Sequence, residues 1–225
     1  MFPETAVVTG SAGGIGRALV ELLESEGTDV RGLDLADGFD VSDPQAWLDV
    51  EAADLVCLNA GVLAKGDGTI DDYRRILAVN VDGVVFGVQA LAPRMATGSA
   101  FVVTASLAGL IPMESDPLYV LTKHAVVGYA RSMAPLLEPR GIRINLVCPG
   151  LVRTPMTEDA QPTLDAAGFP LMEPEQIAAA IIAAGRSEET GQAWVCQPGR
   201  EPLKFKFPNV PGPRVEGAEG MVPQL

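Results

Sequence analysis

The sequence predicts a doubly wound α/β fold, in which helices cover both faces of one parallel sheet and residues 1–225 form a single domain. Short runs of β-branched and apolar residues, such as TAVVTG and SAFVVTAS, alternate with longer segments of helical pattern. Polar residues hardly interrupt these runs, which is typical of strands buried on both faces. At 225 residues and 48% hydrophobic composition, the chain is long enough for one sizeable core.

The elements follow in a regular order. The β-branched runs predict strands at TAVVTG, DVRGLDL, DLVCLNAG, SAFVVTAS, IRINLVCPG and QAWVCQ. Helical patterns are expected between them, over 14–26, shortly after Pro44, over 70–95, around Tyr119 and over 175–184. The segment 199–225 is rich in Pro and Gly, and we expect an irregular C-terminal tail draped over the domain or a partner.

The connection between Asp34 and Asp40 is too short to hold the helix that should follow the second strand. Asp34 and Asp40 both look like residues at strand ends, yet only five residues separate them. A parallel crossover needs about ten residues or more. We therefore expect the helix between the second and third strands to be missing, with ADGFDVSD mainly loop and the third strand vestigial.

Charge and composition exclude several classes of function. Sixteen Lys and Arg against 29 Asp and Glu give a net charge of −13, which disfavours nucleic acids and anionic membrane surfaces as partners. The N-terminus shows no basic segment before a long apolar stretch, and no eighteen apolar residues run together, so neither export nor membrane spanning is expected.

The residues that usually bind metals are few. Cys57, Cys148 and Cys196 lie in separate apolar runs without metal spacing, which favours buried free thiols in a reducing cytoplasm. The chain has one histidine, His124, which excludes a His-rich zinc site. No GxSxG motif surrounds Ser106, which argues against a hydrolase. No metal is expected.

The first chemical motif is TGSAGGIGRA, directly after the first strand. Gly10 allows a tight turn, while Gly14 and Gly16 let a dinucleotide pyrophosphate approach the backbone at a helix N-terminus. Asp34 ends the second strand, where a carboxylate can accept hydrogen bonds from the hydroxyls of an adenosine ribose. The alternatives are a purely structural glycine turn and an ordinary loop aspartate.

Six motifs in order resemble the short-chain dehydrogenase/reductase family, in its single-domain branch. They are the glycine spacing above, LNAG with its residues 59–61, Asn80 in AVNVDG, Ser106 in TASLAG, the YxxxK pair Tyr119 and Lys123, and CPGLVRT at 148–154. The resemblance covers about 5–154. The sequence departs from the family in the missing helix after Asp34, a compressed 151–172 region and VCQPGR after the last strand.

The resemblance implies a Rossmann-type fold and an NAD(P)-dependent oxidoreductase that interconverts a secondary alcohol and a ketone. Proton transfer is implied for Tyr119. Because a phenol is a weak base at neutral pH, Lys123, one helical turn away, should favour its ionised form together with the nicotinamide charge. Ser106 would hold the substrate oxygen, and the backbone of Asn80 would support a proton-carrying water.

The resemblance also implies cofactor contacts, with NAD as the expected cofactor. Asp34 would repel the 2′-phosphate of NADP, and the neighbouring Ser11, Ala12 and Leu35 are not basic. The implied cofactor residues are Gly10, Ser11, Gly14, Ile15, Gly16, Asp34, Asp40, Val41, Asn59, Ala60, Gly61, Tyr119, Lys123, Pro149, Gly150, Val152 and Thr154.

The substrate should lie beyond the carboxyl ends of the strands, against an apolar wall. An apolar wall favours a hydrophobic alcohol or ketone, alicyclic or steroid-like, and 151–172 is expected to act as a lid. The implied substrate contacts are Ser106, Leu107, Met113, Met156 and Phe169, with Leu110, Ile111, Leu171 and Met172 in the same wall. The equally weighted alternative is that several of these residues simply pack against the helix that follows Glu173.

Assembly and two other functions remain open. The family suggests a homotetramer or homodimer through the helices 70–95 and 118–137, with Val120, Val127, Ala130 and Ala134 along the seam. An epimerase or dehydratase of the same superfamily is disfavoured by the chain length and glycine spacing. A catalytically silent NAD-binding regulator should have lost Ser106, Tyr119 or Lys123, and none is lost.

Overall fold

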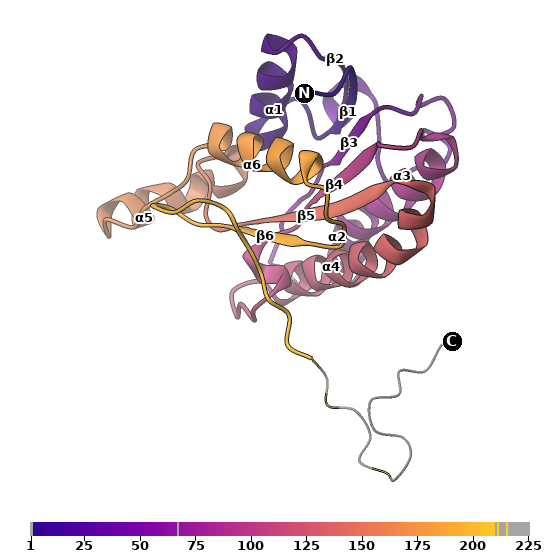
Figure 1. Cartoon of the computed structure of the whole chain (residues 1–225). Helices are drawn as coiled ribbons and strands as arrows, with labels where there is room; N and C mark the ends of the chain where they lie inside the picture. The colour runs from indigo at the N-terminus through magenta and orange to yellow at the C-terminus, as the bar shows by residue number, and fades with distance from the viewer. Residues whose placement is uncertain (1, 67, 210, 212–214, 216–225) are drawn as a thin grey trace.

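The computed structural model describes residues 2–66, 68–209, 211 and 215. One sheet of seven strands runs through it in the order β2-β1-β3-β4-β5-β6-β7 (Figure 1). All neighbouring strands pair in parallel except β6 and β7. The strands are β1 (Thr5–Thr9), β2 (Asp29–Leu33), β3 (Leu55–Leu58), β4 (Ala100–Thr104), β5 (Arg143–Pro149), β6 (Ala193–Cys196) and β7 (Leu203–Lys204).

Helices cover both faces of this sheet, which confirms the doubly wound fold. On one face, α1 (Gly14–Ser25) and α6 (Pro174–Arg186) share a core with side chains of β1, β3, β4 and β5. On the other face lie α2 (Ile70–Leu77), α3 (Gly83–Leu91) and α4 (Pro117–Leu137). The short helix α5 (Gln161–Ala166) stands away from the sheet (Figure 1). Central strands such as β3 and β4 are buried at every position, as their unbroken apolar runs predict.

The order of the strands creates a switch point. From β1 the chain first goes outward to β2, and then crosses back to place β3 on the other side of β1. Loops that leave the carboxyl ends of β1 and β3 therefore diverge, and in open α/β sheets this switch point is where ligands bind. The glycine motif follows β1 and LNAG follows β3, so both lie at this point.

The connection from β2 to β3, residues 34–54, contains no α-helix and no further strand among the described residues, as expected for a missing helix and a vestigial third strand. Within the described residues, only the 3₁₀ turn Leu35–Asp37 and a series of turns occupy this connection. The short helix expected after Pro44 is wrong. Trp47 is buried there, donates from Nε1 to the Val41 carbonyl at 3.0 Å, and meets Phe39 edge-on, so side-chain packing fixes a compact loop instead.

The tail is more ordered than expected up to residue 209. Leu203 and Lys204 form β7, antiparallel to β6, and Phe205 and Phe207 pack against the core on the α4 side. The guanidinium of Arg131 on α4 stacks 3.6 Å from the ring centre of Phe207. Most of the predicted tail beyond residue 209 lies outside the described residues.

Two helical runs, Ile70–Arg94 and α4, bury apolar residues against the sheet. The run Ile70–Arg94 is long and apolar enough to cross a membrane by length and composition, but Val84, Val88 and Leu91 pack into the core of the sheet, as in a soluble core helix. On α4, Val127, Ala130 and Ala134 face the sheet and are buried, so they cannot form the seam expected between subunits. Small and apolar residues indicate a buried stripe, but do not tell whether the chain's own sheet or a partner covers it.

Candidate active site

The glycine turn between β1 and α1 leaves a helix end uncapped. Gly10 and Gly14 have φ angles of 67° and 51°, which favour glycine, and a Cβ on Gly16 would lie 1.9 Å from the Gly10 carbonyl oxygen. Gly13 is the N-cap of α1 and supplies no side-chain hydrogen bond. The first amides of α1 are therefore free of a side-chain cap, and together with the helix dipole they suit a pyrophosphate.

Asn59 holds this turn against the neighbouring strands. Its backbone N–H donates to Thr9 Oγ1 at 2.9 Å and its side-chain amide donates to the Thr9 carbonyl at 3.2 Å. Thr104, at the end of β4, donates to Asn59 Oδ1 at 3.0 Å. The following residue, Ala60, packs where a Gly10 side chain would lie, at 2.9 Å. The predicted residues Asn59 and Ala60 thus shape the cradle, with Thr9 and Thr104, which begin the motifs TGSAGGIGRA and TASLAG, as partners that were not predicted as site residues.

Asp34 lies beside the same turn because the Gly10 N–H donates to the Leu33 carbonyl at 2.8 Å. Its carboxylate accepts from the Ala12 N–H at 3.0 Å and the Ala36 N–H at 2.9 Å. This places an anion next to the predicted phosphate cradle, at the position where a ribose is expected.

Asp40 and Val41 make local contacts of their own. Asp40 accepts from the backbone and hydroxyl of Ser42 at 2.9 and 2.7 Å, which closes a local turn. The Val41 side chain is buried, and it fills the space where a Gly83 side chain would lie, at 2.8 Å. The structure does not bring either side chain into contact with the glycine turn.

Tyr119 and Lys123 share one face of α4, as the four-residue spacing predicts. Both side chains are buried, and Lys123 Nζ lies 5.4 Å from the centre of the Tyr119 ring. Nζ donates to the Thr104 carbonyl at 2.9 Å, and a side chain on Gly61 would lie 3.4 Å from it. The Tyr119 side chain is hydrogen-bonded to Ser106, which follows β4. The predicted Ser, Tyr and Lys therefore meet at the strand ends.

Burial controls the protonation of this cluster. It raises the pKa of Tyr119 to about 12, although the hydrogen bond with Ser106 opposes the shift. It also lowers the pKa of Lys123 to about 8. Contrary to the expectation from the neighbouring Lys123, the phenol pKa is therefore not below its ordinary value, because desolvation of the phenol is the largest influence on it.

Asn80 lies in a π-helical segment of the helical run that follows Thr69. The π-helical segment Ala78–Asp82 joins α2 to α3, and such segments often occur at functional sites. The Asn80 side chain accepts from the Val62 N–H at 2.8 Å and donates to the Val62 carbonyl at 2.9 Å and Thr122 Oγ1 at 3.0 Å. These contacts occupy the side chain, which agrees with a role for its backbone rather than for its amide.

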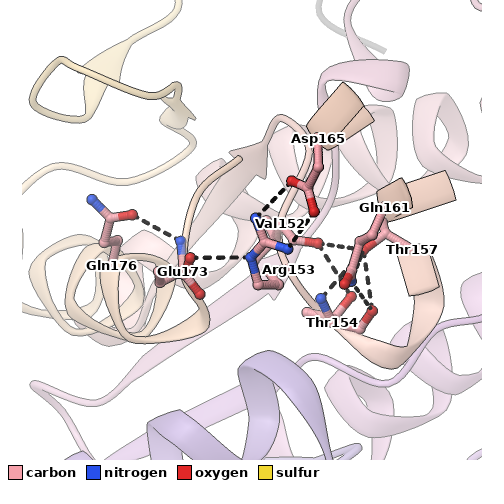
Figure 2. A network of polar contacts seen from close by, with 8 residues as sticks. All are labelled: Val152, Arg153, Thr154, Thr157, Gln161, Asp165, Glu173 and Gln176. Carbon is pink, nitrogen blue, oxygen red and sulfur yellow. Dashed lines mark hydrogen bonds and ion pairs between the residues drawn. The ribbon is translucent and has the colours of Figure 1, made fainter. Parts of the chain in front are cut away.

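A polar network fixes the segment after β5, as Figure 2 shows. Arg153 pairs with Asp165 of α5 at 3.0 Å and with Glu173 at the start of α6 at 3.4 Å. Thr157 Oγ1 donates to the Val152 carbonyl at 2.6 Å and Gln161 Nε2 donates to the Thr154 carbonyl at 3.1 Å (Figure 2). The sequence motifs do not predict this network, since its charges are separated by many residues.

The same segment begins at the cofactor cradle. A side chain on Gly14 would meet the methyl group of Thr154 at 3.1 Å, so the predicted residues Gly14 and Thr154 lie together. Pro149 ends β5, and the Gly150 N–H donates to the Cys196 carbonyl at 2.9 Å. Val152, by contrast, is buried in the core below α6.

The predicted substrate wall is partly exposed. Met113, Met156 and Phe169 are exposed, and Leu107 is half-buried next to Ser106. Met172 is buried with Val152 in the α6 core, so its assignment to the wall is wrong. The sequence could not show whether Met172 lines the substrate pocket or packs into the core, because both positions require apolar residues.

Curated relatives support the motifs. A family model described as enoyl-(acyl carrier protein) reductase matches residues 44–193. An uncharacterized short-chain type dehydrogenase/reductase of Sinorhizobium fredii is 34% identical over 69% of this chain, which spans only 34% of that relative. Trans-4-hydroxycyclohexanecarboxylate dehydrogenase of Sinomonas cyclohexanicum is 33% identical over 63% of this chain, which spans 60% of that relative. Cyclohexanol dehydrogenase of Acinetobacter sp. is 28% identical over 85% of this chain and 92% of its own length.

Solved structures share the architecture. The structure described as short-chain dehydrogenase/reductase SDR:glucose/ribitol dehydrogenase from Brucella melitensis superposes with a TM-score of 0.79 and 27% identity. The match covers 88% of this chain and 98% of that structure. With the glycine turn, the buried Tyr119 and Lys123 and the match over 44–193 in agreement, the chain belongs to the short-chain dehydrogenase/reductase family.

Proposed function

We propose that this chain is an NAD(H)-preferring dehydrogenase that interconverts a secondary alcohol and a ketone on a hydrophobic small molecule. The observation that carries the proposal is the cluster of the half-buried Ser106 and the buried Tyr119 and Lys123 at the strand ends, beside the uncapped glycine turn. A hydrogen-bonded phenol next to a cation is the arrangement that proton transfer to and from a substrate oxygen requires.

The protein's own residues would divide the work as follows. When bound, NAD⁺ supplies the acceptor for the hydride that leaves the alcohol carbon. Ser106 holds the substrate oxygen and Tyr119 takes the hydroxyl proton. Lys123, held by the Thr104 carbonyl at 2.9 Å, would bind the ribose and stabilise the phenolate. Because the pKa of Tyr119 is about 12 before ligands bind, oxidation should become faster as pH rises through the alkaline range.

The preference for NAD(H) rests on the electrostatics around Asp34. The carboxylate is fixed by two backbone amides, and a 2′-phosphate at that position would face this anion. Arg31, the nearest basic residue in sequence, donates instead to the Asp49 carbonyl at 3.0 Å. Comparison of kcat/KM with NAD⁺ and NADP⁺ tests the preference, and equal efficiencies would overturn it.

The substrate class rests on exposed apolar side chains near the site. Met113, Met156 and Phe169 offer apolar surface, and the similarity to a cyclohexanol dehydrogenase favours an alicyclic substrate. A panel of cyclohexanols, sterols, charged sugars and hydroxy amino acids, followed by NADH absorbance, tests this proposal. Cofactor binding is measured separately, since binding without turnover of any alcohol would indicate a silent NAD-binding protein. A clear preference for charged substrates would reject the apolar pocket.

The segment 154–172 is proposed as the lid of this pocket. The segment begins at Thr154 beside Gly14 of the glycine turn and carries the exposed Met156 and Phe169, so its closure would enclose a bound substrate. Cleavage within 154–172 by a protease should slow when NAD⁺ is added. Cleavage that is indifferent to NAD⁺ would reject the lid.

Assembly and location complete the proposal. We expect a homodimer or homotetramer, and Leu121 and Leu136, which are exposed on α4, are the residues that offer apolar contact. A monomer by light scattering at micromolar concentration would contradict this. The three buried free cysteines support a cytoplasmic location.

A further inference from the structure

Asp116 lies outside all the motifs, at the N-cap of α4 and three residues before Tyr119. Its Oδ1 accepts from the Tyr119 N–H at 2.9 Å, which caps the helix. Its Oδ2 accepts from the Ala64 N–H at 3.0 Å, in the loop that follows β3. One carboxylate therefore joins the backbone of the proton-transfer residue to a second segment of the site.

That segment, the loop 62–65, is anchored by a side chain at every residue. Val62 is held by Asn80 and Ala64 by Asp116, as described above. The Leu63 carbonyl accepts from Arg75 Nη2 at 2.7 Å, and the Lys65 N–H donates to Asp72 at 2.6 Å. The loop begins next to Gly61, where Lys123 Nζ lies, so its position and that of the ammonium are linked.

The charges that face Tyr119 come from few groups. Asp116 faces it from the helix N-cap, Lys123 from the next turn of α4, and the Cys148 thiol from β5. Burial raises the pKa of Cys148 to about 12, so this thiol is neutral at physiological pH. On α2, Asp72 is paired with Arg75 at 2.7 Å, which offsets its charge. Asp116, which contacts the Tyr119 backbone, is thus the anion among these groups that has no ion-pair partner in the described part of the chain, and its charge opposes ionisation of Tyr119.

We propose that Asp116 is a positioning residue for the proton transfer, which fixes the first turn of α4 against the loop 62–65 and places a negative charge beside Tyr119. The proposal rests on the proposed function, because it assigns Tyr119 the transferred proton. It predicts that the carboxylate does more than cap a helix. The charge keeps the phenol neutral until ligands bind, and the second hydrogen bond holds the loop 62–65 against α4, with Gly61 beside the Lys123 ammonium.

Two substitutions separate the charge from the cap. In Asp116→Asn one oxygen remains to accept from the Tyr119 N–H, while the charge and the Ala64 contact are lost. Asp116→Ser keeps a good N-cap but also lacks the charge. Asp72→Asn is the matched control, because it releases Lys65 in the same loop and leaves Asp116 in place.

Two measurements are made on each folded variant. The first is the pH dependence of kcat/KM for alcohol oxidation with NAD⁺. The second is the titration of the Tyr119 phenol by NMR of ¹³C-labelled tyrosine, with Tyr119→Phe to identify its signal. Both Asp116 variants should shift the acid limb of the rate profile and the phenol titration toward lower pH by about one unit, and Asp72→Asn should shift neither.

The outcomes are decisive in both directions. Unchanged profiles in the two Asp116 variants, or an equal shift in Asp72→Asn, would overturn the proposal and leave Asp116 as an ordinary helix cap. If no alcohol is oxidised, the proposed function fails, but the NMR titration still tests the effect of Asp116 on the phenol without turnover.

Discussion

Replacement of Lys123 by Met should make the protein more stable while it abolishes turnover. Lys123 is buried, and its pKa falls from 10.5 to about 8 because burial penalises the charged form. At about 1.4 kcal/mol per pKa unit, keeping this ammonium charged near neutral pH costs the folded state about 3 kcal/mol. Met has a similar length and no charge. It loses the hydrogen bond to the Thr104 carbonyl, which contributes about 1 kcal/mol.

The expected net gain is therefore about 2 kcal/mol at neutral pH, or a rise of about 4–8 °C in Tm. The pH dependence of the stability difference between the wild type and Lys123→Met tests the direction of this effect a second time. The folded pKa lies below the unfolded one, so between pH 8 and 10.5 the unfolded chain binds more protons. The stability of the wild type, relative to Lys123→Met, should rise through this window and be lowest below pH 8.

Chemical denaturation of both proteins at several pH values measures this difference. Lys65→Met is the control, because Lys65 is exposed and should change the free energy of unfolding by less than about 0.5 kcal/mol. A Lys123→Met variant that is less stable than the wild type at pH 7, with a difference that does not change up to pH 10.5, would refute the reasoning.

Three further substitutions test the site. Tyr119→Phe should retain the fold and NADH binding but less than about a tenth of the turnover, because only the oxygen that transfers the proton is lost; higher residual activity would reject its role. Gly16→Ala should abolish NADH binding by calorimetry, because the added methyl group would lie 1.9 Å from the Gly10 carbonyl oxygen, and normal affinity would contradict a cradle at this turn. Arg153→Gln should speed proteolysis within 154–172 with little change in global stability, because its ion pairs are solvent-exposed; an unchanged cleavage rate would show that the network does not hold the segment.

Local signals were sufficient for much of this protein. Unbroken β-branched runs gave the parallel strands, because a strand buried on both faces needs apolar residues at every position. The five residues between Asp34 and Asp40 ruled out a crossover helix, because chain length limits connections regardless of packing. The spacing of Tyr119 and Lys123 placed them on one helix face, since residues i and i+4 are neighbours on the surface of an α-helix.

Other properties depended on contacts between distant segments. Whether Val127 and Met172 face a core or a partner follows from which element packs over them, and apolarity alone is the same in both cases. The pKa of Tyr119 depends on burial, which opposed the effect expected from Lys123. The double role of Asp116 and the pairing of Arg153 with Asp165 and Glu173 join residues far apart in sequence. Periodicity and spacing describe one segment at a time, so only the tertiary structure could determine these electrostatic contacts.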